Sequence, residues 1–253
     1  MMHPLREEEN GVFFVDHPSE FRANGYVSEE DLAECVDFAY SMTFGRQGEH
    51  RDHRSGGQAR RRMGEIFTDT FQGKIAEFAF YHLFSCSKAE ITRTDLDVMG
   101  LGKWDTVDFT VAGSRIAIKS TKYFGQLLLL ETKDWTSEGR YIPDGGGCPL
   151  YDYIVLIRVK PELRGIFKEK RWLYSDCVDK SDISDLVSSA DWEINLAGYC
   201  TLDELVSEVI GAGHILPRGS KLNGKTPMDA ENYYIQAGDL HPMSGLISQI
   251  RSQ

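Results

Sequence analysis

The chain has 253 residues, of which 41% are hydrophobic, so it can bury a sizeable core, and no low-complexity segment or fixed-period repeat interrupts it. Its 28 Lys and Arg residues stand against 39 Asp and Glu residues, which gives a formal net charge of −11. This charge excludes binding to nucleic acid through an overall positive field. Any polyanion must therefore meet a local basic patch.

The cysteines and the N-terminus indicate the compartment. The five cysteines are an odd number, lie far apart and include no CxxC pair that could chelate zinc, so they predict reduced thiols. The start MMHPLREEENGVFF lacks the features of a signal peptide, and no stretch approaches the roughly 20 apolar residues that span a bilayer. We expect a soluble, cytoplasmic protein that does not bind a membrane.

The N-terminal third is expected to be helical. In SEEDLAECVDFAYSM, Ser28 is a candidate N-cap and Asp31 occupies the third helical position, where it completes a capping box. A basic stretch follows from Arg46 to Arg62, with arginines at positions 46, 51, 54, 60, 61 and 62. This stretch is a candidate grip on phosphates, and the alternative is a solvated loop.

A second helix is expected in FTDTFQGKIAEFAFYHLF, with Thr68 or Asp69 as its cap. Its residues from Ile75 to Phe84 are apolar almost all round, which is typical of a buried helix. Glu77 lies in the middle of this run, and burying a lone carboxylate is costly unless it is paired or binds a metal. Glu77 is thus a candidate metal ligand, unless it pairs with an arginine in the core or lies on a less buried side.

A β-hairpin is predicted next, because TVDFTV and RIAIKST both alternate and are joined at Ala112-Gly113-Ser114. The period of two puts Ala117 and Lys119 on the face of the strand opposite to its two isoleucines. A two-residue loop would set Asp108 directly across from Ala117 and diagonal to Lys119, whereas a three-residue loop would shift this register. Asp108 and Lys119 could also be an ordinary surface ion pair.

The rest of the chain mixes strands and helices. Strands are expected in GQLLLLE and YIVLIRV, and the Gly- and Pro-rich segment between them is expected to be a long surface loop. A helix in LDELVSEVIGAG, a turn-rich stretch PRGSKLNGKTP and a short helix near SGLISQI follow. The fold class is α/β, with a mixed central β-sheet flanked by helices in a single domain over residues 1–253. Within it, 1–66 form a helical region with a basic loop, 67–160 a core, and 161–253 a mixed C-terminal elaboration.

The helix, the hairpin and their acids and lysine resemble the PD-(D/E)xK nuclease superfamily. QGKIAEFAFYHLF, WDTVDFTV and RIAIKST are similar to its helix and its two motif strands, in the same order, between Gln72 and Glu131. GHILPRGSKL and ENYYIQAGDL are loosely similar to late segments of type II restriction endonucleases. The resemblance implies a restriction-endonuclease-like core that cuts both strands of a specific duplex DNA site.

The resemblance also implies roles for single residues. Asp108 and Glu77 would ligate Mg²⁺, and Lys119 would orient or deprotonate the attacking water and offset charge on the phosphate. The chain would act as a homodimer. No segment has the helix and Lys with Ser or Thr of a phosphate-binding loop, so no nucleotide cofactor is expected. The expected DNA-binding residues are Arg51, Arg54, Arg60, Arg61, Arg62, Lys122, Arg218 and Lys221, with base contacts from residues 133–149 and the PRGSKLNGKTP stretch.

One position departs from the family pattern. The family has Asp or Glu two residues before the lysine, and here that position is Ala117. Three explanations stand: an engineered inactive variant, a second acid supplied from elsewhere such as Glu77 or Glu131, or a natural binding protein that lost catalysis. Two other functions therefore remain open beside the restriction enzyme, namely a structure-specific or repair nuclease and a non-catalytic DNA-binding protein.

Overall fold

The computed structural model describes residues 1–9, 11–45, 61–85, 91, 94, 108–142 and 150–251. Its centre is a four-stranded sheet in the order β3-β4-β6-β7. The strands are β3 (Phe109–Val111), β4 (Ser114–Lys122), β6 (Tyr153–Lys160) and β7 (Glu193–Thr201). Strands β4 and β6 are parallel, and the outer pairs β3–β4 and β6–β7 are antiparallel. The expected mixed central sheet is confirmed.

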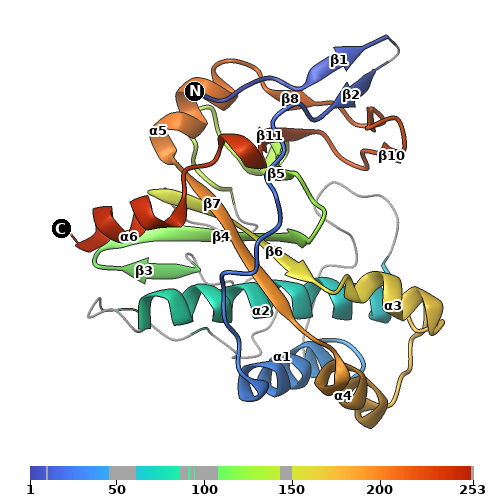
Figure 1. Cartoon of the computed structure of the whole chain (residues 1–253). Helices are drawn as coiled ribbons and strands as arrows, with labels where there is room; N and C mark the ends of the chain where they lie inside the picture. The colour runs from blue at the N-terminus through green and yellow to red at the C-terminus, as the bar shows by residue number, and fades with distance from the viewer. Residues whose placement is uncertain are drawn as a thin grey trace.

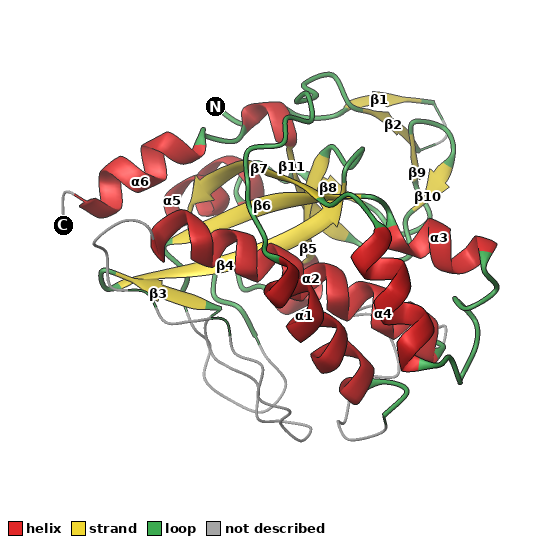
Figure 2. Ribbon diagram, turned by 60° about the horizontal axis from the view of Figure 1, so that its bottom comes forward, coloured by secondary structure: helices red, strands yellow, loops and turns green. Residues whose placement is uncertain are grey.

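Helices cover one face of this sheet (Figures 1 and 2). They are α1 (Glu29–Met42), α2 (Met63–Ser85), α3 (Leu163–Glu169) and α4 (Lys180–Ser189). Helix α2 lies between the sheet and α1, and its phenylalanines share one apolar cluster with Ile116 and Ile118 of β4. Because α2 is covered from both sides, a sequence that is apolar almost all round is stable there.

The other face of the central sheet packs against a second β layer. This layer is the antiparallel sheet β5-β11-β8, built from β5 (Leu127–Glu131), β11 (Asn232–Gln236) and β8 (Ile215–Leu216). Helix α5 (Leu202–Glu204) continues as the π-helical segment Leu205–Ile210 beside it. Ala117, Ile154 and Leu156 of the central sheet join Leu128 and Leu130 of β5 in the apolar cluster between the layers.

The N-terminal region is not only helical, which corrects the expectation. Strands β1 (Arg6–Glu8) and β2 (Val12–Phe14) form a hairpin, and β2 pairs in parallel with β9 (Lys221–Leu222), which in turn pairs with β10 (Thr226–Pro227). The C-terminal part likewise contributes β7 to the central sheet. Two short 3-10 turns, η1 (Thr132–Asp134) and η3 (Ala237–Asp239), follow β5 and β11. The last helix is α6 (Met243–Arg251).

The second helix begins earlier than predicted. Helix α2 starts at Met63, so Thr68 and Asp69 lie inside it and neither is its cap. Ile66 and Phe67 are buried, which extends the apolar surface of the helix by a turn before the predicted start. Inside the helix, the Thr68 hydroxyl donates to the carbonyl of Glu65 at 3.0 Å, so its polarity is satisfied locally.

The hairpin has a two-residue loop. Ala112 and Gly113 both have positive φ, 47° and 84°, as a type I′ turn requires. Val111 pairs with Ser114 and Phe109 with Ile116. The register that sets Asp108 across from Ala117 is therefore confirmed, and the three-residue alternative is excluded.

Among the residues described, no helix has both the length and the apolar character needed to cross a bilayer.

Candidate functional site

Asp108 lies immediately before β3 and is held by its neighbour strand. Its Oδ2 accepts a hydrogen bond from the backbone N–H of Ile118 at 2.7 Å. The carboxylate thus satisfies a backbone donor of β4, and this contact fixes its position against the strand. The residue is exposed, so its other oxygen can meet solvent or a ligand.

Ala117 and Lys119 lie on the face of β4 that points away from α2. Ile116 and Ile118 belong to the apolar cluster around α2, and Ala117 belongs to the cluster on the opposite side. Ala117 has no exposed surface. Lys119 is half-buried, and its Nζ lies 5.5 Å from the centroid of the Tyr141 ring, where the ring face attracts the ammonium.

An aromatic group, Trp135, Tyr141 and Tyr151, lines this side of the site. The ring centroids of Trp135 and Tyr141 are 5.3 Å apart, and those of Tyr141 and Tyr151 are 6.2 Å apart. Burial raises the pKa of the Tyr151 phenol, and the negative charge of Asp108 raises it further. Lys119 therefore lies next to this aromatic group through Tyr141, and the charge of Asp108 acts on Tyr151.

Glu77 is not brought to Asp108 and Lys119. Its Oε2 lies 2.8 Å from Lys74 Nζ, and this lysine lies over the ring of Phe38 of α1. Burial raises the pKa of the Cys35 thiol of α1, and the charge of Glu77 adds to this effect. Glu77 thus faces α1, whereas Ala117 and Lys119 face the opposite side of the sheet. Of the explanations for Glu77, pairing holds, although the partner is a lysine and not an arginine, and the 19% exposure of its side chain also agrees with a less buried side.

Glu131, the other expected source of a second acid, ends β5. It pairs in register with Asn232 of β11, and its Oε2 lies 3.8 Å from Lys133 Nζ. Its side chain is 19% exposed. These contacts assign it to the β5–β11 edge.

The basic residues that are described differ in how firmly acids hold them. Arg61 pairs with Asp69 at 3.2 Å with 17% of its side chain exposed, so it belongs to the packed start of α2. Arg62 pairs with Asp176 at 3.0 Å, but both side chains are more than half exposed. Exposed pairs contribute little stability, so Arg62 can exchange Asp176 for a phosphate. Arg51, Arg54 and Arg60 lie outside the described residues.

The remaining expected DNA contacts lie at two other places. Lys122 ends β4, where its Nζ is 3.6 Å from Glu162 and 4.4 Å from the ring centroid of Phe124. Arg218 and Lys221 are exposed in the turn between β8 and β9 and at the start of β9. Lys221 therefore presents its charge on the small sheet that the N-terminal hairpin joins.

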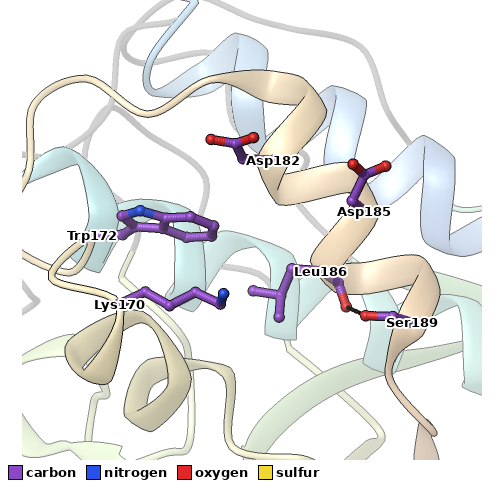
Figure 3. A pocket seen from close by; sticks show the side chains of 6 residues that line it. All are labelled: Lys170, Trp172, Asp182, Asp185, Leu186 and Ser189. Carbon is purple, nitrogen blue, oxygen red and sulfur yellow. Dashed lines mark hydrogen bonds between the residues drawn. The ribbon is translucent and has the colours of Figure 1, made fainter.

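A pocket of about 420 Å³ opens elsewhere, in the helical layer. Lys170 and Trp172 form one side of it, and α4 forms the other (Figure 3). The Lys170 ammonium lies 5.0 Å from the centroid of the Trp172 ring. Because the pocket is on the helical face of the sheet and Lys119 points to the opposite face, the pocket includes none of the expected site residues.

Comparison of this chain with protein-family models, with curated proteins and with solved structures finds no match. One carboxylate is fixed at a strand edge, one ammonium projects from the same face of the sheet, and the ring of Tyr141 lies beside the ammonium. This arrangement suits an anionic ligand that contacts the Lys119 ammonium and also binds a cation held by Asp108.

The sequence missed the three aromatic residues. Trp135, Tyr141 and Tyr151 lie in or beside the segment predicted as a long functional loop, so the signal pointed to the segment and not to its side chains. Isolated bridges from Trp135 to Tyr141 and from Arg140 to Leu150 fold the described part of this segment back on itself. These bridges hold Tyr141, whose ring lies beside Lys119, in the folded part of the segment.

Proposed function

We propose that this chain binds duplex DNA and has the site of a metal-dependent nuclease. Asp108 would be the metal ligand, and Lys119 would act on the attacking water. The observation that carries the proposal is the hairpin register. It aligns Asp108 with Ala117 and leaves Lys119 two residues further along the same face. That is the spacing of the family motif, with alanine at the position of its second acid.

The donor set fits a small, hard cation in part. Mg²⁺ is commonly held by one or two carboxylates together with substrate phosphates, and Asp108 offers one carboxylate. When bound, Mg²⁺ would supply Lewis-acid activation of the phosphate. The lysine would orient the nucleophilic water and stabilise negative charge on the phosphate. The ring of Tyr141 holds the Lys119 ammonium, which reduces the number of conformations open to the lysine side chain.

Ala117 determines whether this chain can cut. An acid at this position would be buried in an apolar cluster beside Asp108, and two adjacent carboxylates without a cation repel each other. An acid here is therefore compatible with the fold chiefly when a cation is bound between it and Asp108. We therefore expect a form of the site that cuts to hold a metal, and we expect the present chain, with Ala117, to be a poor catalyst.

The proposal extends to a type II restriction enzyme, a homodimer that cuts a specific duplex site, because that is the subclass the sequence resembles most. A non-catalytic DNA-binding protein is the second candidate. The complete burial of Ala117 favours it, because the apolar cluster is well packed without an acid. The two candidates share the DNA-binding surface and differ in what an acid at position 117 does.

The deciding experiment compares the chain with its Ala117→Asp and Ala117→Glu variants on mixed plasmid and phage DNA with Mg²⁺. We expect one variant to produce discrete bands that disappear with EDTA and after a further Lys119→Ala or Asp108→Asn change. Glu77→Gln is the matched control, because Glu77 faces α1, and it should leave cutting by the variant unchanged. Cutting at no preferred sequence would favour the structure-specific or repair nuclease.

Thermal stability gives a second measurement on the same variants. Mg²⁺ should raise the Tm of Ala117→Asp more than that of the starting chain, because a ligand that binds only the folded state stabilises it. Asp108→Asn in the Ala117→Asp background should remove the difference. If no variant cuts and Mg²⁺ stabilises none of them while the folded protein still binds duplex DNA, the non-catalytic candidate replaces the nuclease.

A further inference from the structure

Two histidines and an aspartate from distant parts of the chain meet at one point away from the candidate site. His3 precedes β1, His17 follows β2, and Asp239 ends η3. The Nδ1 atoms of His3 and His17 lie 2.7 Å and 3.1 Å from the same oxygen of Asp239. One donor atom from each residue lies within 4.8 Å of the other two.

The carboxylate of this cluster is buried, and the imidazoles are not. The Asp239 side chain is 2% exposed, whereas those of His3 and His17 are 42% and 41% exposed. The second oxygen of Asp239 accepts the backbone N–H of His3 at 2.9 Å. A buried carboxylate requires a cationic or hydrogen-bonding partner, and the two imidazoles are the partners of one of its oxygens.

The backbone around both histidines is fixed by the same short segment that carries Asp239. The fully buried side chain of Gln236 accepts from the N–H of His17 at 2.9 Å and donates to the carbonyl of His3 at 3.1 Å. The N–H of Gly238 donates to the carbonyl of His17 at 3.0 Å. A Cβ at Gly238 would lie 2.6 Å from that oxygen, so only glycine allows this approach. The three donors are thus held together by contacts that do not use their donor atoms.

We propose that His3, His17 and Asp239 bind a divalent transition-metal ion of the zinc class. Two imidazole nitrogens and one carboxylate oxygen suit such ions, whereas Mg²⁺ and Ca²⁺ prefer oxygen ligands alone. Ligands of a tetrahedral ion at about 2.1 Å lie about 3.4 Å from one another. The exposed rings therefore move outward slightly on binding while the buried carboxylate stays in place, and the remaining coordination position faces solvent.

The ion would tie the N-terminal hairpin to η3, which directly follows β11. His3 and His17 flank β1 and β2, and this hairpin belongs to the same sheet as Lys221 of β9 (Figure 1). The proposed ion is distinct from the Mg²⁺ proposed at Asp108, both in its ligands and in its place. The inference is therefore independent of the proposed nuclease function.

The test is Zn²⁺ titration of the metal-free full-length chain, purified without a histidine tag, by calorimetry and by competition with a chromophoric chelator. We expect one equivalent of Zn²⁺ to bind, Co²⁺ to give a visible absorption band at the same stoichiometry, and excess Mg²⁺ not to displace either ion. His17→Ala and Asp239→Asn should each lower the affinity by more than about tenfold, since loss of even an outer partner costs about 10–100-fold.

His82→Gln is the matched control. His82 pairs with the buried carboxylate of Asp31 at 2.7 Å, which is the same kind of contact with a single imidazole. Its substitution should leave Zn²⁺ affinity unchanged. The proposal is overturned if the folded chain binds no Zn²⁺, or if His17→Ala binds it as tightly as the unaltered chain. His17 is exposed, so this variant keeps the test decisive even if Asp239→Asn does not fold.

Discussion

The guanidinium of Arg158 lies in the core of the molecule between β6 and the segment that precedes α1. Its side chain has no exposed surface. It donates to the carbonyls of Ser19 and Glu20 at 2.8 Å and 2.7 Å and to the side chain of Asn195 at 2.8 Å. Burial lowers the pKa of Arg158, and neutral oxygens surround the charge. The interaction fixes residues 19 and 20 to β6 of the central sheet.

We predict that Arg158→Met lowers the free energy of unfolding by about 3 kcal/mol, because the buried Asn195 side chain and two partly buried carbonyls lose their donor. Urea denaturation measures this change. The matched control is Arg22→Met, since Arg22 is 78% exposed and pairs with the exposed Glu20. Arg22→Met should stay within about 0.5 kcal/mol of the unaltered chain. Equal effects of the two substitutions would contradict the structural role of Arg158.

Single residues of the candidate site were predictable where their position depends on local geometry. The face shared by Ala117 and Lys119 follows from the period of a strand, and it holds here. Glu77 was expected near them because it is the acid inside an apolar helix. The side of a buried helix that meets the sheet depends on packing with α1, which the periodicity of α2 does not encode because α2 is apolar almost all round.

At the scale of elements, the start of α1 shows how a short signal fixes a helix end. Ser28 and Asp31 form the predicted capping box, with the Asp31 N–H donating to the Ser28 hydroxyl at 3.1 Å and the Asp31 carboxylate accepting the Ser28 N–H at 2.7 Å. His82 of α2 contacts the same carboxylate oxygen at 2.7 Å. The cap therefore joins α1 to α2 as well as beginning α1.

The pH dependence of this cap can be predicted. Burial acts to raise the pKa of Asp31, but the hydrogen bonds from Ser28 and His82 outweigh it, so the pKa lies below its usual value of 3.8. A carboxyl with a depressed pKa in the folded state stabilises fully above its usual pKa, and this contribution is lost as pH falls through the folded-state value. Asp31→Asn should cost about 1 kcal/mol at pH 6, and this cost should shrink below about pH 4.

Urea denaturation of the two chains from pH 6 to pH 3 measures this difference. Glu30→Gln is the control, because Glu30 is an exposed neighbour in the same first turn. A cost of Asp31→Asn that does not change with pH would show that the charge of Asp31 is not what the cap uses.

The elements that the sequence predicted are those with a strong local signal. Helices α1 and α6 and strands β4, β5 and β6 fall where caps, apolar periods and turn residues indicate them. Strand β7 was missed, since Gly198 and the register shift opposite Leu156 and Ile157 interrupt its alternation. Strands β1 and β2 are three residues each, which is too short for a period. They pair with each other, and β9 from the other end of the sequence pairs with β2.

At the scale of the whole molecule, the proposed DNA binding works against a net charge of −11. Binding must then come from a few cations on one surface, each of which releases a condensed counterion from the DNA. The number of these cations sets how steeply the affinity falls with salt, with a slope of about −0.9 for each neutralised phosphate of B-DNA. The slope thus counts the contacts independently of the affinity itself.

We predict that Lys221→Ala makes this slope shallower by about one unit, because Lys221 is exposed on the sheet that includes β9 and can reach a phosphate. The measurement is duplex binding across a series of salt concentrations, by anisotropy of a labelled DNA. Lys180→Ala is the control, since Lys180 pairs with Asp37 at 2.9 Å in the helical layer below α2 (Figure 1). The slope of Lys180→Ala should equal that of the unaltered chain.

If both variants have the slope of the unaltered chain, Lys221 contacts no phosphate, and the DNA surface must lie on another face. If Lys180→Ala alone changes the slope, that face is the helical layer and not the side to which Lys119 points.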